Sequence, residues 1–118
     1  MLSIEEVIVV LQWKVFSEPF MNANRIFPLQ QKRVKQMVDY LSQDPNVQSI
    51  TIFGSSVTPQ CHNDSDLDMY VEVKEDKRLI HTYFDFLYDL WTNYTIDDQM
   101  LKEIQTKGVK VYERNAAG

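Results

Sequence analysis

The amino-acid sequence predicts a small protein of the α/β (α+β) class, on three observations. The chain has 118 residues, fewer than the roughly 150 of a typical domain, so 1–118 is expected to form a single domain. Hydrophobic residues make up 44% of the chain and aromatic residues 12%, which is enough to build a core. Helix-like and strand-like periodicities follow one another in the order α, α, β, β, α, β, α, β.

The N-terminal part, 1–27, is expected to add a helix and a loop to the main body of the domain, 28–114. A helix is predicted over 3–16, because Ser3 and Glu6 have the spacing of a capping box. Two further valines widen its apolar face, so a strand remains the alternative there. The apolar positions at helical spacing are Ile4, Val7, Ile8, Leu11 and Val15.

A second helix is predicted over 28–43, followed by a strand over 47–53. Pro28 suits a first helical turn, where its missing N–H needs no partner. Pro45 ends the helix, because the residue before a proline avoids helical backbone angles. The strand is predicted by its β-branched residues. The apolar stripe of the helix is Leu29, Val34, Met37, Val38 and Leu41.

The middle of the chain contains one clear strand and one ambiguous segment. Over 67–73 apolar and polar residues alternate, as in a strand with one buried face. The stretch from Asp76 to Trp91 fits one helical face throughout, but so long a helix leaves little room for a strand after it. We therefore predict a helix over 76–85 and a strand over 87–92, with a helix through Trp91 as the alternative.

A last helix and a last strand are predicted at the C-terminal end. Thr95 and Asp98 stand three residues apart before an apolar periodicity, which predicts a helix over 96–107. Gly108 is expected to end that helix. Residues 109–112 are apolar enough to form a short final strand.

Charge and cysteine content exclude several classes of protein. With 12 basic and 17 acidic residues the net charge is −5, which disfavours a general nucleic-acid-binding protein. A single cysteine allows no intrachain disulfide and suits a reducing, cytoplasmic environment. No apolar run approaches the roughly 18 residues of a membrane span, and the start lacks a basic leader. Neither a membrane anchor nor a secretory signal is therefore expected.

Two features between the predicted strands point to phosphate and metal chemistry. Gly54-Ser55 follows a strand, and such a junction can present backbone N–H groups to a phosphate. Asp66 and Asp68 lie two residues apart on the next strand, so their carboxylates share one face and repel each other. A divalent cation such as Mg²⁺ would remove that repulsion. Each feature alone is common as a hydrated turn or strand edge, but together they indicate a metal site beside a phosphate cradle.

The same residues resemble the signature of a known family. Ile52-Phe53-Gly54-Ser55 and Ser65-Asp66-Leu67-Asp68, with twelve residues from Gly54 to Asp66, are similar to the motif of the minimal nucleotidyltransferases of the DNA polymerase β-like superfamily. The resemblance extends from about Arg33 to Glu113. It implies a nucleotidyltransferase fold with a small mixed β-sheet flanked by helices, to which residues 1–27 would add an N-terminal helical extension.

The resemblance also implies an activity and a set of site residues. Members transfer a nucleoside monophosphate, here AMP from ATP as the first expectation, to an acceptor hydroxyl and release pyrophosphate. Three carboxylates hold two Mg²⁺ ions, and the first two correspond to Asp66 and Asp68. The third belongs to the following strand, where Asp89 has the matching hydrophobic context and Asp97 is the alternative. The triphosphate is expected to bind at Gly54, Ser55, Ser56 and Ser65.

The loop after Gly54-Ser55 departs from the family pattern. Many relatives have arginine at the positions of Ser56 and Thr58 and glycine at that of Pro59, so here fewer cations face the phosphates. A catalytically weak nucleotide-binding or antitoxin-like module is therefore the alternative function, and a purely structural interaction protein is the third.

The acceptor and the partners are expectations from the same resemblance. At 118 residues the chain has little room for an acceptor pocket of its own, so a protein or a small molecule held by another chain would supply the hydroxyl. Small members often resemble the antitoxin partner of a HEPN-type toxin. The expected partners are therefore a nucleoside triphosphate and either a HEPN-type protein or a second copy of this chain.

Overall fold

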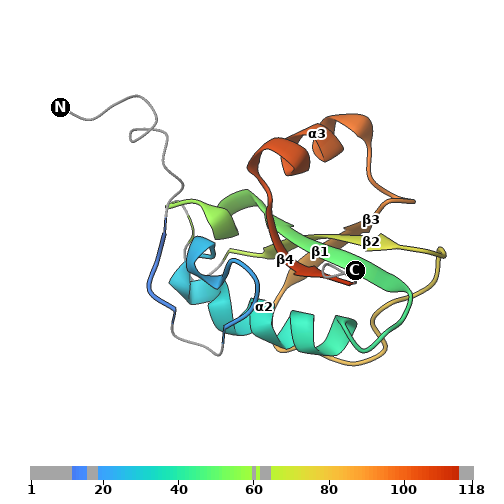
Figure 1. The fold of residues 1–118 in the computed structure, drawn as a ribbon, viewed down its shortest axis with the longest axis horizontal. Coiled ribbons are helices and arrows are strands. Elements are labelled where there is room, and N and C mark those ends of the chain that lie inside the picture. The colour runs from blue at the N-terminus through green and yellow to red at the C-terminus, as the bar shows by residue number, and fades with distance from the viewer. Residues whose placement is uncertain (1–11, 16–18, 60, 62–64, 115–118) are drawn as a thin grey trace.

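A computed structural model of the chain describes residues 12–15, 19–59, 61 and 65–114 (Figure 1). Two α-helices, four strands and two short 3-10 helices make up its regular structure. In chain order these are η1 (Ala23–Arg25), α2 (Pro28–Leu41), β1 (Val47–Phe53), η2 (Gly54–Val57), β2 (Leu67–Val73), β3 (Tyr88–Thr92), α3 (Asp98–Lys107) and β4 (Val109–Glu113).

The four strands form one mixed sheet in the order β3-β2-β1-β4, as the family resemblance implies. β1 lies at its centre and pairs antiparallel with both β2 and β4, whereas β2 and β3 are parallel. Antiparallel pairing places the end of β1 beside the start of β2, so that Phe53 is opposite Asp68. Parallel pairing places Asp68 opposite Asp89.

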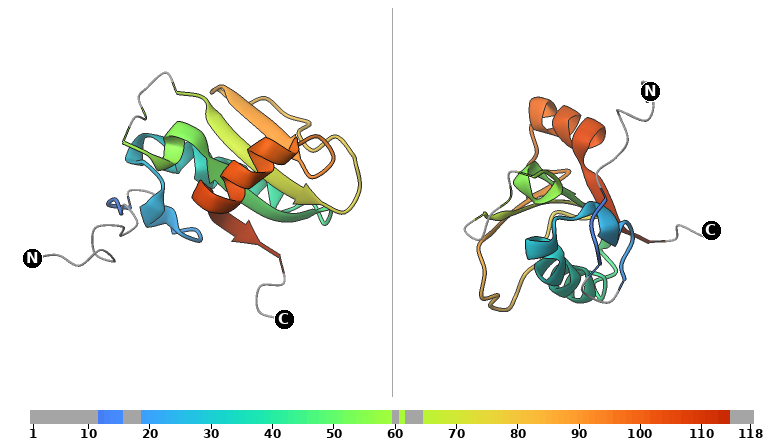
Figure 2. Two further views of the ribbon diagram at one scale, coloured as in Figure 1. Left: turned by 90° about the horizontal axis from the view of Figure 1, so that it is seen from above. Right: turned by 90° about the vertical axis from the view of Figure 1, so that its left-hand side faces the viewer.

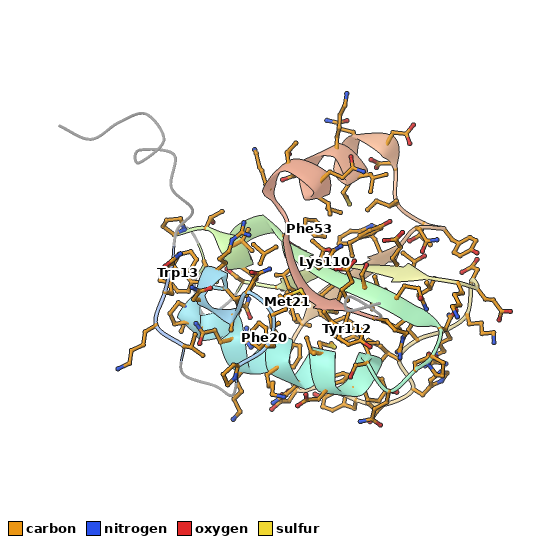
Figure 3. The ribbon with its side chains drawn as sticks, in the orientation of Figure 1. Trp13, Phe20, Met21, Phe53, Lys110 and Tyr112 are labelled. Atoms are coloured by element: carbon orange, nitrogen blue, oxygen red, sulfur yellow. The ribbon has the colours of Figure 1, made fainter. Side chains whose placement is uncertain are left out.

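The sheet separates two helical layers, with α2 on one face and α3 on the other (Figures 1 and 2). Alternate strand residues point to opposite faces, which divides the apolar side chains into two groups. The larger group packs α2 against the sheet and includes Met37, Leu41, Ile50 and Met69, each with no exposed surface. The smaller group packs α3 through Ile104 and is visible at Phe53 in Figure 3.

Several predicted elements are confirmed. The strands predicted over 47–53 and 67–73 have those bounds in the structure. The predicted helix 28–43 ends at Leu41, with Ser42 as its C-cap. The strand predicted over 87–92 begins at Tyr88. The strand predicted over 109–112 runs one residue further, to Glu113.

The helix predicted over 76–85 is wrong: those residues have no regular secondary structure. The segment carries the chain from the end of β2 back to the start of β3, because parallel neighbours need a crossover. Several of its apolar residues pack against the core on the α2 side of the sheet. Leu79 is buried there, and the Phe84 ring lies edge-on to the Tyr40 ring, with 5.5 Å between the ring centres. The backbone N–H of His81 donates to the Tyr40 hydroxyl (2.9 Å), so tertiary contacts replace helical hydrogen bonds.

The N-terminal helix predicted over 3–16 is wrong where the structure describes it. Residues 12–15 have no regular secondary structure, and the rest of the prediction lies outside the described residues. The N–H of Trp13 donates to the carbonyl of Asn24 (2.6 Å), and its ring contacts Phe27 edge-on at 5.4 Å. These contacts hold this short segment against η1 and the start of α2.

The helix predicted over 96–107 begins at Asp98 in the structure. Its N-cap is Asp97, whose carboxylate accepts a hydrogen bond from the N–H of Met100 (2.7 Å). Thr95 instead closes the preceding turn, where its hydroxyl accepts from the N–H of Thr92 (2.8 Å). The predicted helix is therefore present, but its N-cap is Asp97 and not Thr95.

None of the helices in the described ranges combines the length and apolar character that a membrane crossing requires.

Candidate active site

The site begins where β1 ends and η2 starts. Gly54 has a φ of +74°, a left-handed conformation that residues with a side chain rarely adopt. A Cβ atom at this position would collide with the Oδ2 atom of Asp68 on the neighbouring strand. Glycine is therefore favoured by the backbone angle, and it also leaves room for the Asp68 carboxylate in its present position.

The predicted carboxylates gather at this end of the sheet. Asp68 and Asp89 are register partners on adjacent parallel strands and lie on the face that α3 covers. Asp66 precedes β2 by one residue. Asp68 is half-buried, whereas Asp66 and Asp89 are exposed. The structure thus brings the second and third predicted carboxylates next to each other and leaves the first at the rim.

The surroundings of Asp68 make its negative charge costly. Burial is the largest cause that raises the pKa of Asp68 to about 6, and repulsion by Asp89, Asp66 and Glu103 adds to it. Glu103 belongs to α3, so the helix brings a fourth carboxylate near the three from the strands. A positive charge bound here would relieve this repulsion.

The carboxylates are suitable ligands for a hard divalent cation, but their side chains do not converge on one point. Carboxylate oxygens are the ligands that Mg²⁺ prefers. As they stand, no three His, Cys, Asp or Glu side chains in the described ranges form a group able to hold a metal ion. Because Asp66 and Asp89 are exposed, their side chains can rotate toward Asp68 without disturbing the core.

A cavity of about 310 Å³ is lined in part by Gly54. The η2 segment contributes Gly54 and Ser55 to its lining, and the end of α3 contributes Glu103 and Lys107. Two larger cavities, of about 470 and 430 Å³, are lined by none of the residues predicted for the site. The cavity at Gly54 is thus bounded by the predicted phosphate loop on one side and by α3 on the other, and its lining does not include Asp66, Asp68 or Asp89.

The predicted phosphate-binding residues do not all face this space. Ser56 has no exposed surface, and its carbonyl accepts a hydrogen bond from the N–H of Phe27 (2.9 Å). Its hydroxyl is buried with no hydrogen-bond partner in the described part of the chain. The Ser56 side chain is therefore directed into the protein, and of the four residues predicted to bind the triphosphate only Gly54 and Ser55 line the cavity.

Ser65 is held by the helix on the opposite face of the sheet. Its carbonyl accepts hydrogen bonds from Nε2 of Gln30 (3.1 Å) and Nη1 of Arg33 (3.4 Å). Gln30 has no exposed surface, and the Arg33 guanidinium lies 5.7 Å from the centre of the Phe86 ring. These contacts position the chain just before Asp66.

Sequence reasoning missed four residues around the site: Gln30, Arg33, Glu103 and Lys107. Arg33 is half-buried, and its guanidinium donates to the carbonyl of Ser65. Gln30 could have been noticed in the sequence, because it is a polar residue next to the apolar stripe of the predicted helix. Glu103 and Lys107 carry no local signal, since a helix with exposed charges has the same pattern.

Asp97, the alternative third carboxylate, occupies a different place. It caps α3 through its bond to the N–H of Met100 and is not on a strand. Asp89 has the position on β3 beside Asp68 that the family resemblance requires of this residue.

Comparisons with known proteins agree with this arrangement. A search of the curated proteins finds no match. The family model described as "Polymerase beta, Nucleotidyltransferase" matches residues 35–117, a range that contains the sheet, η2 and α3. With most of its length matched and with its glycine and carboxylates at one end of a mixed sheet, the chain belongs to the polymerase β nucleotidyltransferase family.

Proposed function

We propose that this nucleotidyltransferase moves a nucleoside monophosphate, AMP from ATP as the first choice, to an acceptor hydroxyl. The acceptor oxygen forms a bond to the α-phosphorus, the bond from that phosphorus to the β-phosphate oxygen breaks, and pyrophosphate leaves. The observation that carries the proposal is the position of Asp68. Its half-buried carboxylate lies beside Asp89, with Gly54 in contact and the cavity beyond.

The residues divide the work between holding cations and holding phosphates. Asp66, Asp68 and Asp89 would bind two Mg²⁺ ions, which in such sites stabilise the attacking and leaving oxygens together. The backbone of Gly54 and Ser55 would bind the triphosphate, because N–H groups at a tight turn attract anions. Asp89, which is exposed, would accept the proton of the incoming hydroxyl.

A second candidate function rests on the phosphate loop. Because Ser56 is buried and Thr58 bonds back to the Ser55 carbonyl (3.2 Å), neither replaces the arginines of many relatives. This favours a catalytically weak nucleotide-binding or antitoxin-like module. Tyr83 and Leu87 are 85% and 72% exposed, and a HEPN-type partner or a second copy would cover such apolar residues.

Transfer of label from α-labelled ATP with Mg²⁺ tests the two candidates. The purified chain is incubated with a lysate of the source cell, beside the Asp66→Ala/Asp68→Ala variant and beside γ-labelled ATP. We expect a labelled product only from α-labelled ATP and the unchanged protein. The mass of that product identifies the acceptor. A folded protein that gives no label with any of the four nucleoside triphosphates supports the binding module instead.

Separate replacement of Asp89 and Asp97 tests which is the third carboxylate. We expect Asp89→Ala to lower transfer at least about 100-fold, because the proton acceptor and a metal ligand are lost. Asp97→Ala removes the N-cap of α3, so the free energy of unfolding should fall by about 1 kcal/mol while transfer stays within about twofold. Denaturant unfolding and the label assay measure the two effects, and the reverse pattern would assign the role to Asp97.

A further inference from the structure

The cavity beside Gly54 has a second wall that the phosphate loop does not provide. The last two turns of α3 contribute Glu103 and Lys107, four residues apart and therefore on one face of the helix. Thr58 and Val57 complete the η2 side. Figure 1 shows η2 next to the end of α3 that leads into β4. Two segments about fifty residues apart in the chain thus enclose one space.

The charges along this space are ordered. The Asp68 carboxylate touches the Gly54 end, and Glu103 is near enough to Asp68 to repel it. Among the described residues that line the cavity, Lys107 is the one with a basic side chain. From Gly54 to Asp66 the sequence contains no lysine or arginine, so the loop itself brings no strong cation. Within the described lining of this cavity, a chain of phosphates that passed over Gly54 would meet a positive charge at Lys107 on α3.

Lys107 is available for such a contact. It is exposed, and within the described ranges no ion pair joins it to Glu103, although that spacing permits one. Other exposed lysines do pair with neighbours, as Lys77 does with Glu75 at 2.7 Å and Lys110 with Glu113 at 3.3 Å. Lys102, on the same helix, does not line the cavity.

We infer that Lys107 and the cavity between η2 and α3 form the site for the β- and γ-phosphates of the nucleotide, with Lys107 in place of a loop cation. The inference rests on the proposed function, since it concerns the triphosphate of the same reaction. Glu103 opposes a bare polyphosphate and favours one that brings a cation with it. The two side chains of α3 therefore act on ligand affinity with opposite signs.

Calorimetric titration with inorganic tripolyphosphate, without divalent cations, tests this site apart from catalysis. We expect Lys107→Gln to weaken binding about 5- to 10-fold and Lys107→Arg to retain it. Glu103→Gln should strengthen binding about 2- to 5-fold, because a repulsive charge is removed. Lys102→Gln is the matched control, with the same change of net charge on the same helix, and should change affinity less than about twofold. Thermal unfolding of each variant verifies that it is folded.

Other outcomes overturn the inference without deciding the proposed function. Equal losses in Lys107→Gln and Lys102→Gln would show a general charge effect, and an unchanged affinity in Lys107→Gln would place the phosphates elsewhere. Failure of the unchanged protein to bind tripolyphosphate also overturns it. The label assay on the unchanged protein decides separately whether nucleotidyl transfer occurs, so either conclusion can fail alone.

Discussion

Replacement of Asp68 by asparagine is expected to abolish nucleotidyl transfer and, without divalent cations, to increase the free energy of unfolding. Transfer should fall at least about 1000-fold, because a carboxylate that we propose as a ligand of the metal ions is lost. Stability should rise because the pKa of Asp68, about 6 in the folded protein, lies above its ordinary value of 3.8. Ionisation of this group therefore opposes folding.

The sign of the pH dependence follows from that difference. Between about pH 4 and pH 6 the folded state binds more protons than the unfolded state, so stability falls as the pH rises through this window. The full shift corresponds to about 3 kcal/mol. Since Asp68 is only half-buried, solvent screening reduces this, and we expect a gain of about 1–2 kcal/mol for Asp68→Asn at pH 7.5.

Denaturant unfolding at pH 7.5 and at pH 4 measures this effect. The gain should shrink at pH 4, where the aspartate is largely protonated. Asp85→Asn is the control, because Asp85 is exposed in the segment before β3 and makes the same change of charge. A loss of stability in Asp68→Asn at pH 7.5, or a gain equal to that of Asp85→Asn, would contradict the crowded environment of Asp68.

Replacement of Gly54 by alanine is expected to lower both stability and transfer. A left-handed backbone costs an L-residue about 1–2 kcal/mol, which should appear in the free energy of unfolding. The new Cβ also meets the end of the Asp68 side chain, which can yield by rotating. We expect this rotation to move the carboxylate off the site and to lower transfer at least about tenfold.

A double-mutant cycle separates the two causes. In an Asp68→Ala background, Gly54→Ala no longer meets the carboxylate, so only the backbone cost should remain. Unfolding is measured for the four proteins of the cycle, and transfer is measured for those that contain Asp68. An identical stability cost in both backgrounds would show that the contact between residue 54 and Asp68 contributes nothing.

Local patterns were sufficient for much of the site. β1 and β2 were predicted with correct bounds because β-branched or alternating residues favour strands without help from distant contacts. Gly54 and Asp68 follow directly from those two strands, since the antiparallel register makes the end of one meet the start of the other. The positions of Gly54 and Asp68 at the ends of β1 and β2 could thus be predicted from the sequence.

Other elements could not be predicted from local patterns. The segment over 76–85 has helical spacing, yet several of its apolar side chains pack against α2 and the sheet. It forms the crossover between the parallel strands β2 and β3 and makes no helical hydrogen bonds. The cap of α3 depended on which of several polar residues adopts an extended backbone, and that residue is Asp97. In both places tertiary contacts outweighed local preference.

By itself the sequence determined the class of fold and the two central strands, and it singled out Gly54 and the pair Asp66 and Asp68, because each depends on residue type and short spacing; Asp89 was implied by the family resemblance. Only the tertiary structure decided the rest of the site. It turned Ser56 inward, placed Asp89 beside Asp68, and brought Glu103 and Lys107 to the space beyond Gly54. The physical reason is that these positions depend on how α3 packs over the sheet, and a row of exposed charges on a helix does not show which of them will face another part of the chain.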